Sequence, residues 1–153
     1  MKNLILSFFT GLLLVTATTF AQTSTTVDVK NLQTSDHAMH KVIFQMVSGD
    51  TLAHKALMHQ LNNLKEVWGD AVTLEVLVQG PALDLLQSAK STQKESIAGL
   101  NKRGIHFAAC EFSMKQRHIT KEEILPGVEF VKYGLVEIIT KQEQGWSYLK
   151  GGF

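Results

Sequence analysis

Gly104-Ile105-His106-Phe107-Ala108-Ala109-Cys110 is the stretch that decides the fold, because it joins a helix stop, a buried strand and a reactive atom. Glycine at its first position can close a helix, and the apolar run that follows has the length of a buried strand. The strand ends at Cys110, the only cysteine among the 153 residues. Open α/β sheets bind ligands at the carboxyl ends of their strands, so the sequence predicts a functional thiol here.

The residues after Cys110 predict a short helix and supply the groups that would modulate the thiol. Ser113, with Gln116 three positions later, fits the N-cap of that helix. A helix N-terminus favours thiolate over thiol, whereas Glu111 opposes ionisation if its carboxylate points at the sulfur. The cationic candidates that would favour ionisation are Lys115, Arg117 and His118. We therefore predict a catalytic Cys110 that is at least partly accessible.

Apolar runs of strand length alternate with helical patterns along the rest of the chain. The other strands are predicted at residues 41–47, 72–78, 128–131 and 146–149, and the even-numbered residues of 72–78 share one face. Helical segments are predicted at residues 51–68, 81–87, 92–104 and 135–144. Capping signals occur at Asp50, at Thr92 with Glu95, and at Thr120 with Glu123. This alternation indicates right-handed crossovers and a parallel, three-layer α/β sheet.

The first 21 residues have the pattern of a secretory signal peptide. Lys2 gives a positive start, residues 4–15 form an apolar run, and Ala21 provides a small residue for a signal peptidase. The run is shorter than the roughly 20 apolar residues of a membrane-spanning helix. We expect cleavage near Ala21, export to the periplasm or the medium, a flexible lead-in at 22–38 and one domain at 39–153. No membrane span is expected in the mature chain.

Composition argues against nucleic-acid, phosphate and metal binding. Without Lys2, 15 − 1 = 14 basic residues balance 14 acidic ones, so no basic surplus for nucleic acid is visible. Glycine-rich phosphate loops are absent from the sequence. Two of the six histidines, His54 and His59, lie five apart on a predicted helix and project to different faces. We therefore expect no metal and no cofactor.

Seven short motifs in this order resemble the DsrE/DsrF-like family of sulfur-relay proteins, from about His40 to Lys150. They lie at residues 40–45, 48–50, 62–64, 80–86, 104–110, 125–128 and 145–148. The resemblance implies a three-layer α/β/α fold with a parallel five-stranded sheet, assembled into trimers or hexamers. It also implies a cysteine at the end of the third strand that carries sulfur as a persulfide, and Cys110 falls at that position. Two departures are the Glu111-Phe112-Ser113-Met114 segment, where similar proteins often have Gly-Asn-Thr-Met, and the export signal.

Two hypotheses from different classes follow, and they leave open whether the protein is an enzyme. In the first, it is a sulfur carrier or sulfurtransferase-like protein that takes sulfur from a donor onto Cys110 and passes it to an acceptor. In the second, it is an exported, non-catalytic oligomeric binding or assembly module of the same fold. A buried cysteine behaves as a small hydrophobe, so accessibility of the thiol distinguishes the two.

Overall fold

The structure is a computed structural model that describes residues 39–153. The predicted signal peptide at residues 1–21 and the predicted lead-in at residues 22–38 lie outside the described residues. Within 39–153, no helix combines the length and the hydropathy that crossing a membrane requires.

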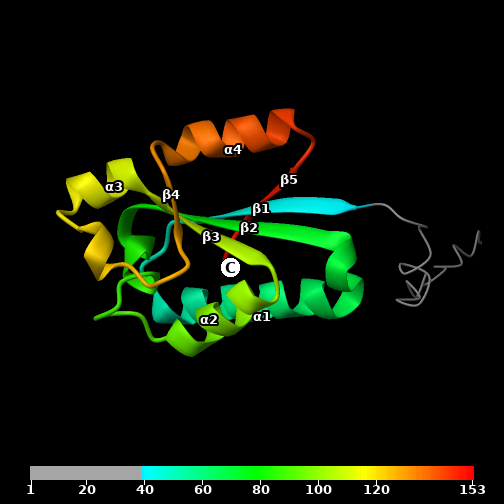
Figure 1. Cartoon of the computed structure of the whole chain (residues 1–153), viewed down its shortest axis with the longest axis horizontal. Helices are drawn as coiled ribbons and strands as arrows, with labels where there is room; N and C mark the ends of the chain where they lie inside the picture. The colour runs from blue at the N-terminus through cyan, green and yellow to red at the C-terminus, as the bar shows by residue number, and fades with distance from the viewer. Residues whose placement is uncertain (1–38) are drawn as a thin grey trace, which may run out of the picture.

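Five parallel strands form one sheet in the order β4-β3-β2-β1-β5 (Figure 1). The strands are β1 (His40–Met46), β2 (Val72–Val78), β3 (Ile105–Cys110), β4 (Glu129–Val131) and β5 (Ser147–Lys150). Each strand lies within one or two residues of its predicted position. Helices cover both faces, so the prediction of a parallel, three-layer α/β/α fold is confirmed.

The order of the strands fixes which helix covers which face. The α-helices are α1 (Thr51–Trp68), α2 (Lys94–Lys102), α3 (Glu111–Gln116) and α4 (Gly134–Glu143). Short 3-10 helices are η2 (Gly69–Ala71), η3 (Gly80–Leu85) and η4 (Lys121–Glu123). Strands β1 to β4 step across the sheet in one direction, whereas β5 returns to the far side of β1. Because parallel crossovers are right-handed, α1 and α2 lie below the sheet and α4 lies above it (Figure 1).

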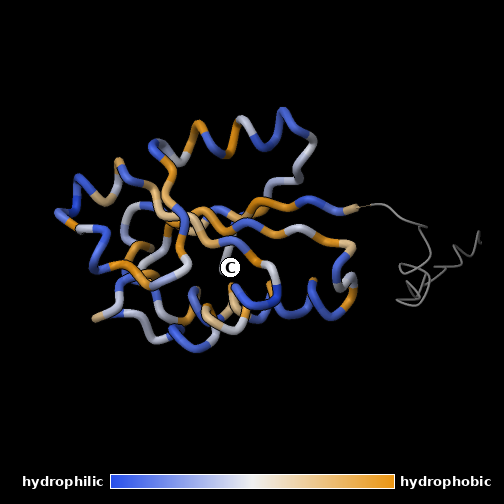
Figure 2. The backbone as a smooth tube through the Cα atoms, in the orientation of Figure 1, coloured by the Kyte–Doolittle hydropathy of each residue, from blue (hydrophilic) through white to orange (hydrophobic). Residues whose placement is uncertain are grey.

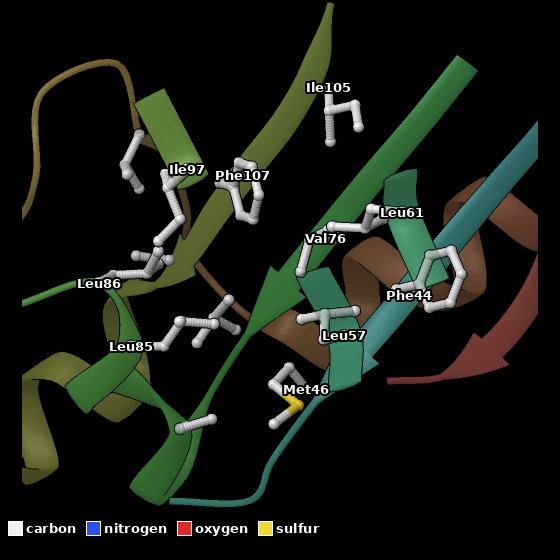
Figure 3. Close-up of a cluster of buried hydrophobic side chains, with 14 of the residues drawn as sticks. Phe44, Met46, Leu57, Leu61, Val76, Leu85, Leu86, Ile97, Ile105 and Phe107 are labelled. Atoms are coloured by element: carbon white, nitrogen blue, oxygen red, sulfur yellow. The ribbon is translucent and has the colours of Figure 1, made fainter. Parts of the chain in front are cut away.

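The larger core lies between the sheet and α1. The predicted alternation of β2 is confirmed, since its even-numbered residues join this core while Leu77 joins the cluster on the opposite face. Leu57 and Leu61 of α1 pack over the sheet near Phe44 and Val76 (Figure 3). Hydrophobic residues accordingly run along the strands (Figure 2). This face supplies most of the buried apolar surface of the fold.

The face under α4 holds a smaller apolar cluster and a buried ion pair. Ile138 of α4 contacts a group of sheet residues that consists of Ile43, Leu77 and Ala108. Beside it, Lys141 of α4 pairs with the buried Glu75 of β2 over 2.5 Å. The Lys141 ammonium also lies 4.4 Å from the centre of the Trp146 ring. An ion pair as well as apolar contacts therefore holds helix α4 on the sheet.

Two of the four predicted caps are confirmed and two are wrong. Asp50 accepts a hydrogen bond from the Leu52 N–H over 2.8 Å, and Thr120 forms a capping box with Glu123. Thr92 is not an N-cap, because α2 begins at Lys94 and Gln93 occupies the N-cap position. The Gln93 N–H donates a hydrogen bond to Ser91 Oγ. Ser113 is not an N-cap either: β3 turns directly into α3 at Cys110, so Ser113 lies inside the helix and is buried.

Candidate functional site

Cys110 is both the last residue of β3 and the N-cap of α3, as the sequence predicted for the end of this strand. The chain after β3 leads to the α1 face, because Met114 and Ile119 join the core there. The chain after the neighbouring β4 leads into α4 on the opposite face (Figure 1). Neighbouring strands whose connections leave to opposite faces open a crevice at their carboxyl ends, where open α/β sheets bind ligands. The thiol lies at this crevice.

A backbone N–H of α4 points at the sulfur. The N–H of Gly134, the first residue of α4, donates a hydrogen bond to Cys110 Sγ over 3.3 Å. Gly134 stands at the N-terminus of α4, which has ten residues, so the positive end of the helix dipole also lies beside the sulfur. Negative charge on Sγ is stabilised by both, and a thiolate is the nucleophilic form of cysteine.

A side chain at position 134 would not fit without a local shift. A Cβ at this position would lie 2.3 Å from Gln79 Oε1 and 3.1 Å from Leu77 Cδ2. Both distances are shorter than ordinary van der Waals contact, so a side chain would move either Gln79 or the start of α4. Sequence analysis missed Gly134, although a glycine between a predicted strand and a predicted helix at the same sheet edge could have marked it.

A cavity of about 490 Å³ opens beside Cys110 at the carboxyl ends of the strands. Its lining is mostly apolar and consists of Val47, Gln79, Gly80, Cys110, Phe112, Ser113, Gln116, Tyr133, Gly134, Leu135 and Val136. Cys110 is only 3% exposed. The prediction of partial exposure is therefore wrong, because the buried Gly134 packs directly against the sulfur. Cys110 is nevertheless one of the residues that line the cavity.

Glu111 and the three predicted cations do not line this cavity. The Glu111 carboxylate pairs with Lys121 over 2.5 Å, so its charge is compensated. Lys115 and His118 line an adjoining hollow of about 510 Å³, together with Lys132. Of the predicted modulating residues, the structure brings only Ser113 into the cavity with Cys110.

Arg117 fixes the turn after β2 instead of contacting the thiol. Its guanidinium donates to the carbonyl oxygens of Gly80 and Pro81 over 2.9 and 3.1 Å and to Asp84 Oδ1 over 2.9 Å. Burial raises the pKa of Asp84, but the hydrogen bonds and charges of Lys90 and Arg117 lower it by more, so the net pKa lies below its ordinary value. Gly80 lines the cavity, so Arg117 helps to shape its wall.

The histidines are dispersed over the described residues. His54 is buried, and its Nε2 lies 2.8 Å from the carbonyl oxygen of Ser48. His106 lies 2.7 Å from Glu129 on the exposed part of the sheet, and His40 stacks on Trp68. Within residues 39–153, no three side chains of His, Cys, Asp or Glu gather as a metal site would require.

The chain belongs to the DsrE/DsrF-like family, whose profile matches residues 39–150. The match spans nearly all of the described domain and confirms the resemblance that the sequence motifs indicated. A comparison with curated proteins gives no match.

Three solved structures share the fold at low identity. MTH1491 from Methanobacterium thermoautotrophicum, described as a protein of unknown function, has a TM-score of 0.64 and 22% identity, with 72% of this chain and 98% of that chain covered. The ychN protein from E. coli has a TM-score of 0.58 and 15% identity, with coverages of 73% and 99%. BT1422 from Bacteroides thetaiotaomicron, also of unknown function, has a TM-score of 0.55 and 18% identity, with coverages of 76% and 98%. At these identities the likeness establishes the fold alone.

Proposed function

We propose that this protein is a sulfur carrier or sulfurtransferase-like protein that holds sulfur as a persulfide on Cys110. The observation that carries the proposal is the hydrogen bond from Gly134 N–H to Cys110 Sγ beside a cavity, in a chain of the DsrE/DsrF-like family. Membership of this family supports a role related to sulfur relay. The cavity supplies room next to the sulfur for a small donor or for the end of a larger one.

The chemistry consists of two exchanges at sulfur. In loading, the Cys110 thiolate attacks the outer sulfane sulfur of a donor, a new S–S bond forms, and the donor leaves with the electron pair of its broken bond. In unloading, an acceptor thiolate attacks the outer sulfur of the persulfide, and Cys110 leaves as thiolate. Because Sγ carries negative charge before loading and after unloading, the Gly134 N–H favours the thiolate form that begins the first step and stabilises the leaving thiolate of the second.

The proposal includes export and assembly. The signal-peptide pattern of residues 1–21 supports a periplasmic or secreted protein, with cleavage near Ala21. The exposed apolar side chains of Tyr148, Leu149 and Phe153 near the C-terminus supply contact area for a homotrimer or homohexamer. The intact mass of exported material tests the cleavage, and light scattering at micromolar concentration tests the assembly. Full-length protein in the cytosol, or a strict monomer, would contradict these two parts.

Mass spectrometry of the loaded protein tests the central claim. The mature protein is incubated separately with thiosulfate, inorganic polysulfide and dispersed elemental sulfur, and its intact mass is measured under non-reducing conditions. At least one donor should add sulfur to the native protein, and a reducing thiol should remove it. The variant Cys110→Ser should gain none. Transfer of the added sulfur to a small acceptor thiol completes the test.

A non-catalytic oligomeric binding or assembly module is the second candidate function. The observation that favours it is the 3% exposure of Cys110, which suits a core residue. In that case no donor adds sulfur, and the thiol resists alkylation until the protein unfolds. Assembly would then be unchanged in Cys110→Ser.

A further inference from the structure

The cavity beside Cys110 is uncharged. Among the described residues that line it, none has an ionisable acid or base apart from Cys110 and the phenol of Tyr133. Its polar side chains are those of Gln79, Ser113 and Gln116, and its most exposed walls are apolar. The one backbone N–H that faces the sulfur, that of Gly134, is already bonded to Sγ.

The nearby basic residues do not line the thiol cavity. Lys115, Lys132 and His118 line the adjoining hollow, which shares only Phe112, Gln116 and Tyr133 with the thiol cavity. The rings of Phe112 and Tyr133 pair at 5.9 Å, and the Lys132 ammonium lies over Tyr133 at 5.6 Å. Lys121 and Arg117 form ion pairs of their own, Lys121 with Glu111 and Arg117 with Asp84.

The position of the basic residues outside the cavity bears on which sulfur donors can bind inside it. An anion loses hydration when it enters an apolar space and needs a paired cation or several N–H donors to offset that loss. The lining residues include no cation, and their side-chain N–H donors are the two amides of Gln79 and Gln116. An uncharged apolar molecule instead gains free energy when it covers Val136, Leu135 and Phe112.

We propose, as an extension that rests on the proposed function, that the cavity selects uncharged, apolar sulfane sulfur and disfavours anionic oxo-sulfur donors. Elemental sulfur represents the first class and thiosulfate the second. The Cys110 thiolate attacks one atom of the sulfur ring, a new S–S bond forms to Sγ, and one ring S–S bond breaks. The negative charge moves to the far end of the opened chain, so atoms and electrons balance without an added oxidant.

Methanethiosulfonate reagents measure this selectivity at the same reacting sulfur. Each forms a mixed disulfide with Cys110 and releases methanesulfinate, so a benzyl reagent and a sulfonatoethyl reagent differ mainly in their apolar or anionic arm. The rate with native protein is divided by the rate with the urea-unfolded chain, which carries the same single thiol. We expect this ratio to be at least about tenfold higher for the benzyl reagent, because the anionic arm finds no cation among the lining residues and the benzyl arm covers apolar ones.

A matched pair of lysine variants tests whether the cavity causes the preference. Val136 is 58% exposed and lines the cavity, whereas Ile139 on the same helix is 56% exposed and does not. Val136→Lys should bring the two reagents to within about threefold of each other by placing a cation at the mouth. Ile139→Lys should leave the preference as in the wild type. Light scattering and circular dichroism on both variants separate this effect from lost assembly or lost folding.

Loading with elemental sulfur and with thiosulfate then separates the inference from the proposed function. Preference for the benzyl reagent together with loading by elemental sulfur supports both. Preference for the benzyl reagent without loading by any donor supports the selectivity of the cavity but overturns the sulfur-carrier function. Equal reaction with both reagents, or faster loading by thiosulfate, overturns the inference even if the protein carries sulfur.

Discussion

The two faces of the sheet differ in how they are held and in what they carry. On the α1 face, a continuous cluster includes Phe44, Leu57, Leu61 and Phe107 (Figure 3). On the α4 face of the described domain, the buried apolar cluster has four members, and the Glu75–Lys141 ion pair adds to it. Burial of apolar surface dominates folding free energy, so the α1 face contributes most of the stability.

The less packed face is also the one that holds the thiol. Side chains alternate along a strand, so Cys110 points to the same face as Ala108, under α4. The first residue of α4 contacts the sulfur, and the exposed side of α4 borders the cavity. Binding segments are commonly drawn from the less stable parts of a fold. Residues at the cavity rim can therefore change while the packing of the α1 face keeps the domain folded.

Truncating one large side chain on each face should give the largest effects and tests this contrast directly. Leu57→Ala should lower the free energy of unfolding by about 3–5 kcal/mol, because it leaves a void in a fully enclosed cluster. Ile138→Ala should cost about 2 kcal/mol, because Ile138 is 6% exposed and belongs to a buried cluster of only four residues. Urea unfolding followed by circular dichroism measures both. Equal losses would show that the two faces are equally important for stability.

Breaking the ion pair under α4 should have the next largest effect. Glu75→Gln should destabilise the protein by about 1–3 kcal/mol, since Lys141 would stay partly buried without its main partner. Glu137→Gln is the matched control: Glu137 also contacts Lys141, over 3.5 Å, but it is more exposed, and its loss should cost about 0.5 kcal/mol or less. Hydrogen exchange should show that Glu75→Gln opens α4 before α1. Simultaneous loss of protection in both helices would contradict the separate attachment of α4.

The same pair predicts how stability changes at alkaline pH. Burial lowers the pKa of Lys141, but the hydrogen bond and charge of Glu75, with a contribution from Glu137, raise it by more. The net pKa lies above the ordinary value of 10.5. A raised folded-state pKa gives stability that is complete below the unfolded value and is lost as pH rises through the folded value. Wild-type stability should therefore fall above about pH 10.5, and Glu75→Gln should flatten this fall.

Most of the fold could be predicted from the sequence because its signals are local. Parallel strands that are covered on both faces read as apolar runs, and the predicted runs at 41–47, 72–78 and 105–110 match β1, β2 and β3 closely. Capping was predicted less well. The capping-box pattern at Thr92 and Glu95 depends on the residues from 92 to 95 alone and takes no account of the turn that precedes them. Ser91 holds that turn and moves the start of α2 to Lys94.

The site could be predicted only in part, because its decisive contacts join distant residues. Cys110 was found from its place at the end of a strand. Its partner Gly134 is 24 residues away and reaches it only because β4 pairs with β3. Lys121, the partner of Glu111, lies 121 − 111 = 10 residues further along the chain and beyond α3, so the direction of that carboxylate was not readable from the sequence.

A smaller effect is expected at the turn after β2, which the pair of Arg117 and Asp84 holds. Asp84→Asn should cost about 0.5–1 kcal/mol at neutral pH, because it weakens a half-buried ion pair with Arg117 and an exposed one with Lys90. The pKa of Asp84 is lowered in the folded state, so this contribution is present above the ordinary value of 3.8 and is lost as pH falls through the folded value. Wild type and variant should converge in acid-unfolding titrations below about pH 3.8. A constant difference down to the most acidic pH would rule out the ion pair as its cause.

The smallest change in stability, and the most informative one about the thiol, is expected for Gly134→Ala. Alanine restricts the unfolded chain, which stabilises by about 0.4–1 kcal/mol, but its Cβ would displace Gln79 and crowd Leu77. These effects oppose each other, so the net change in unfolding free energy should be within about 0.5 kcal/mol. The variant should still fold cooperatively. Because the fully buried Leu77 leaves little room for the new Cβ even when Gln79 swings aside, we expect the start of α4 to shift away from the sulfur.

That shift lengthens the hydrogen bond from residue 134 to Cys110 Sγ, so the thiolate loses a donor and part of the helix-end field. The alkylation rate of Cys110 at neutral pH should fall about two- to fivefold, which corresponds to the 0.3–1 kcal/mol typical of a charge at a helix end. Gly99→Ala is the control, because a Cβ there meets open space on α2. It should raise stability by up to about 1 kcal/mol and leave alkylation unchanged. If Gly134→Ala alkylates as fast as Gly99→Ala, the N–H of α4 does not activate the sulfur, and the α4 face would serve only to cover it.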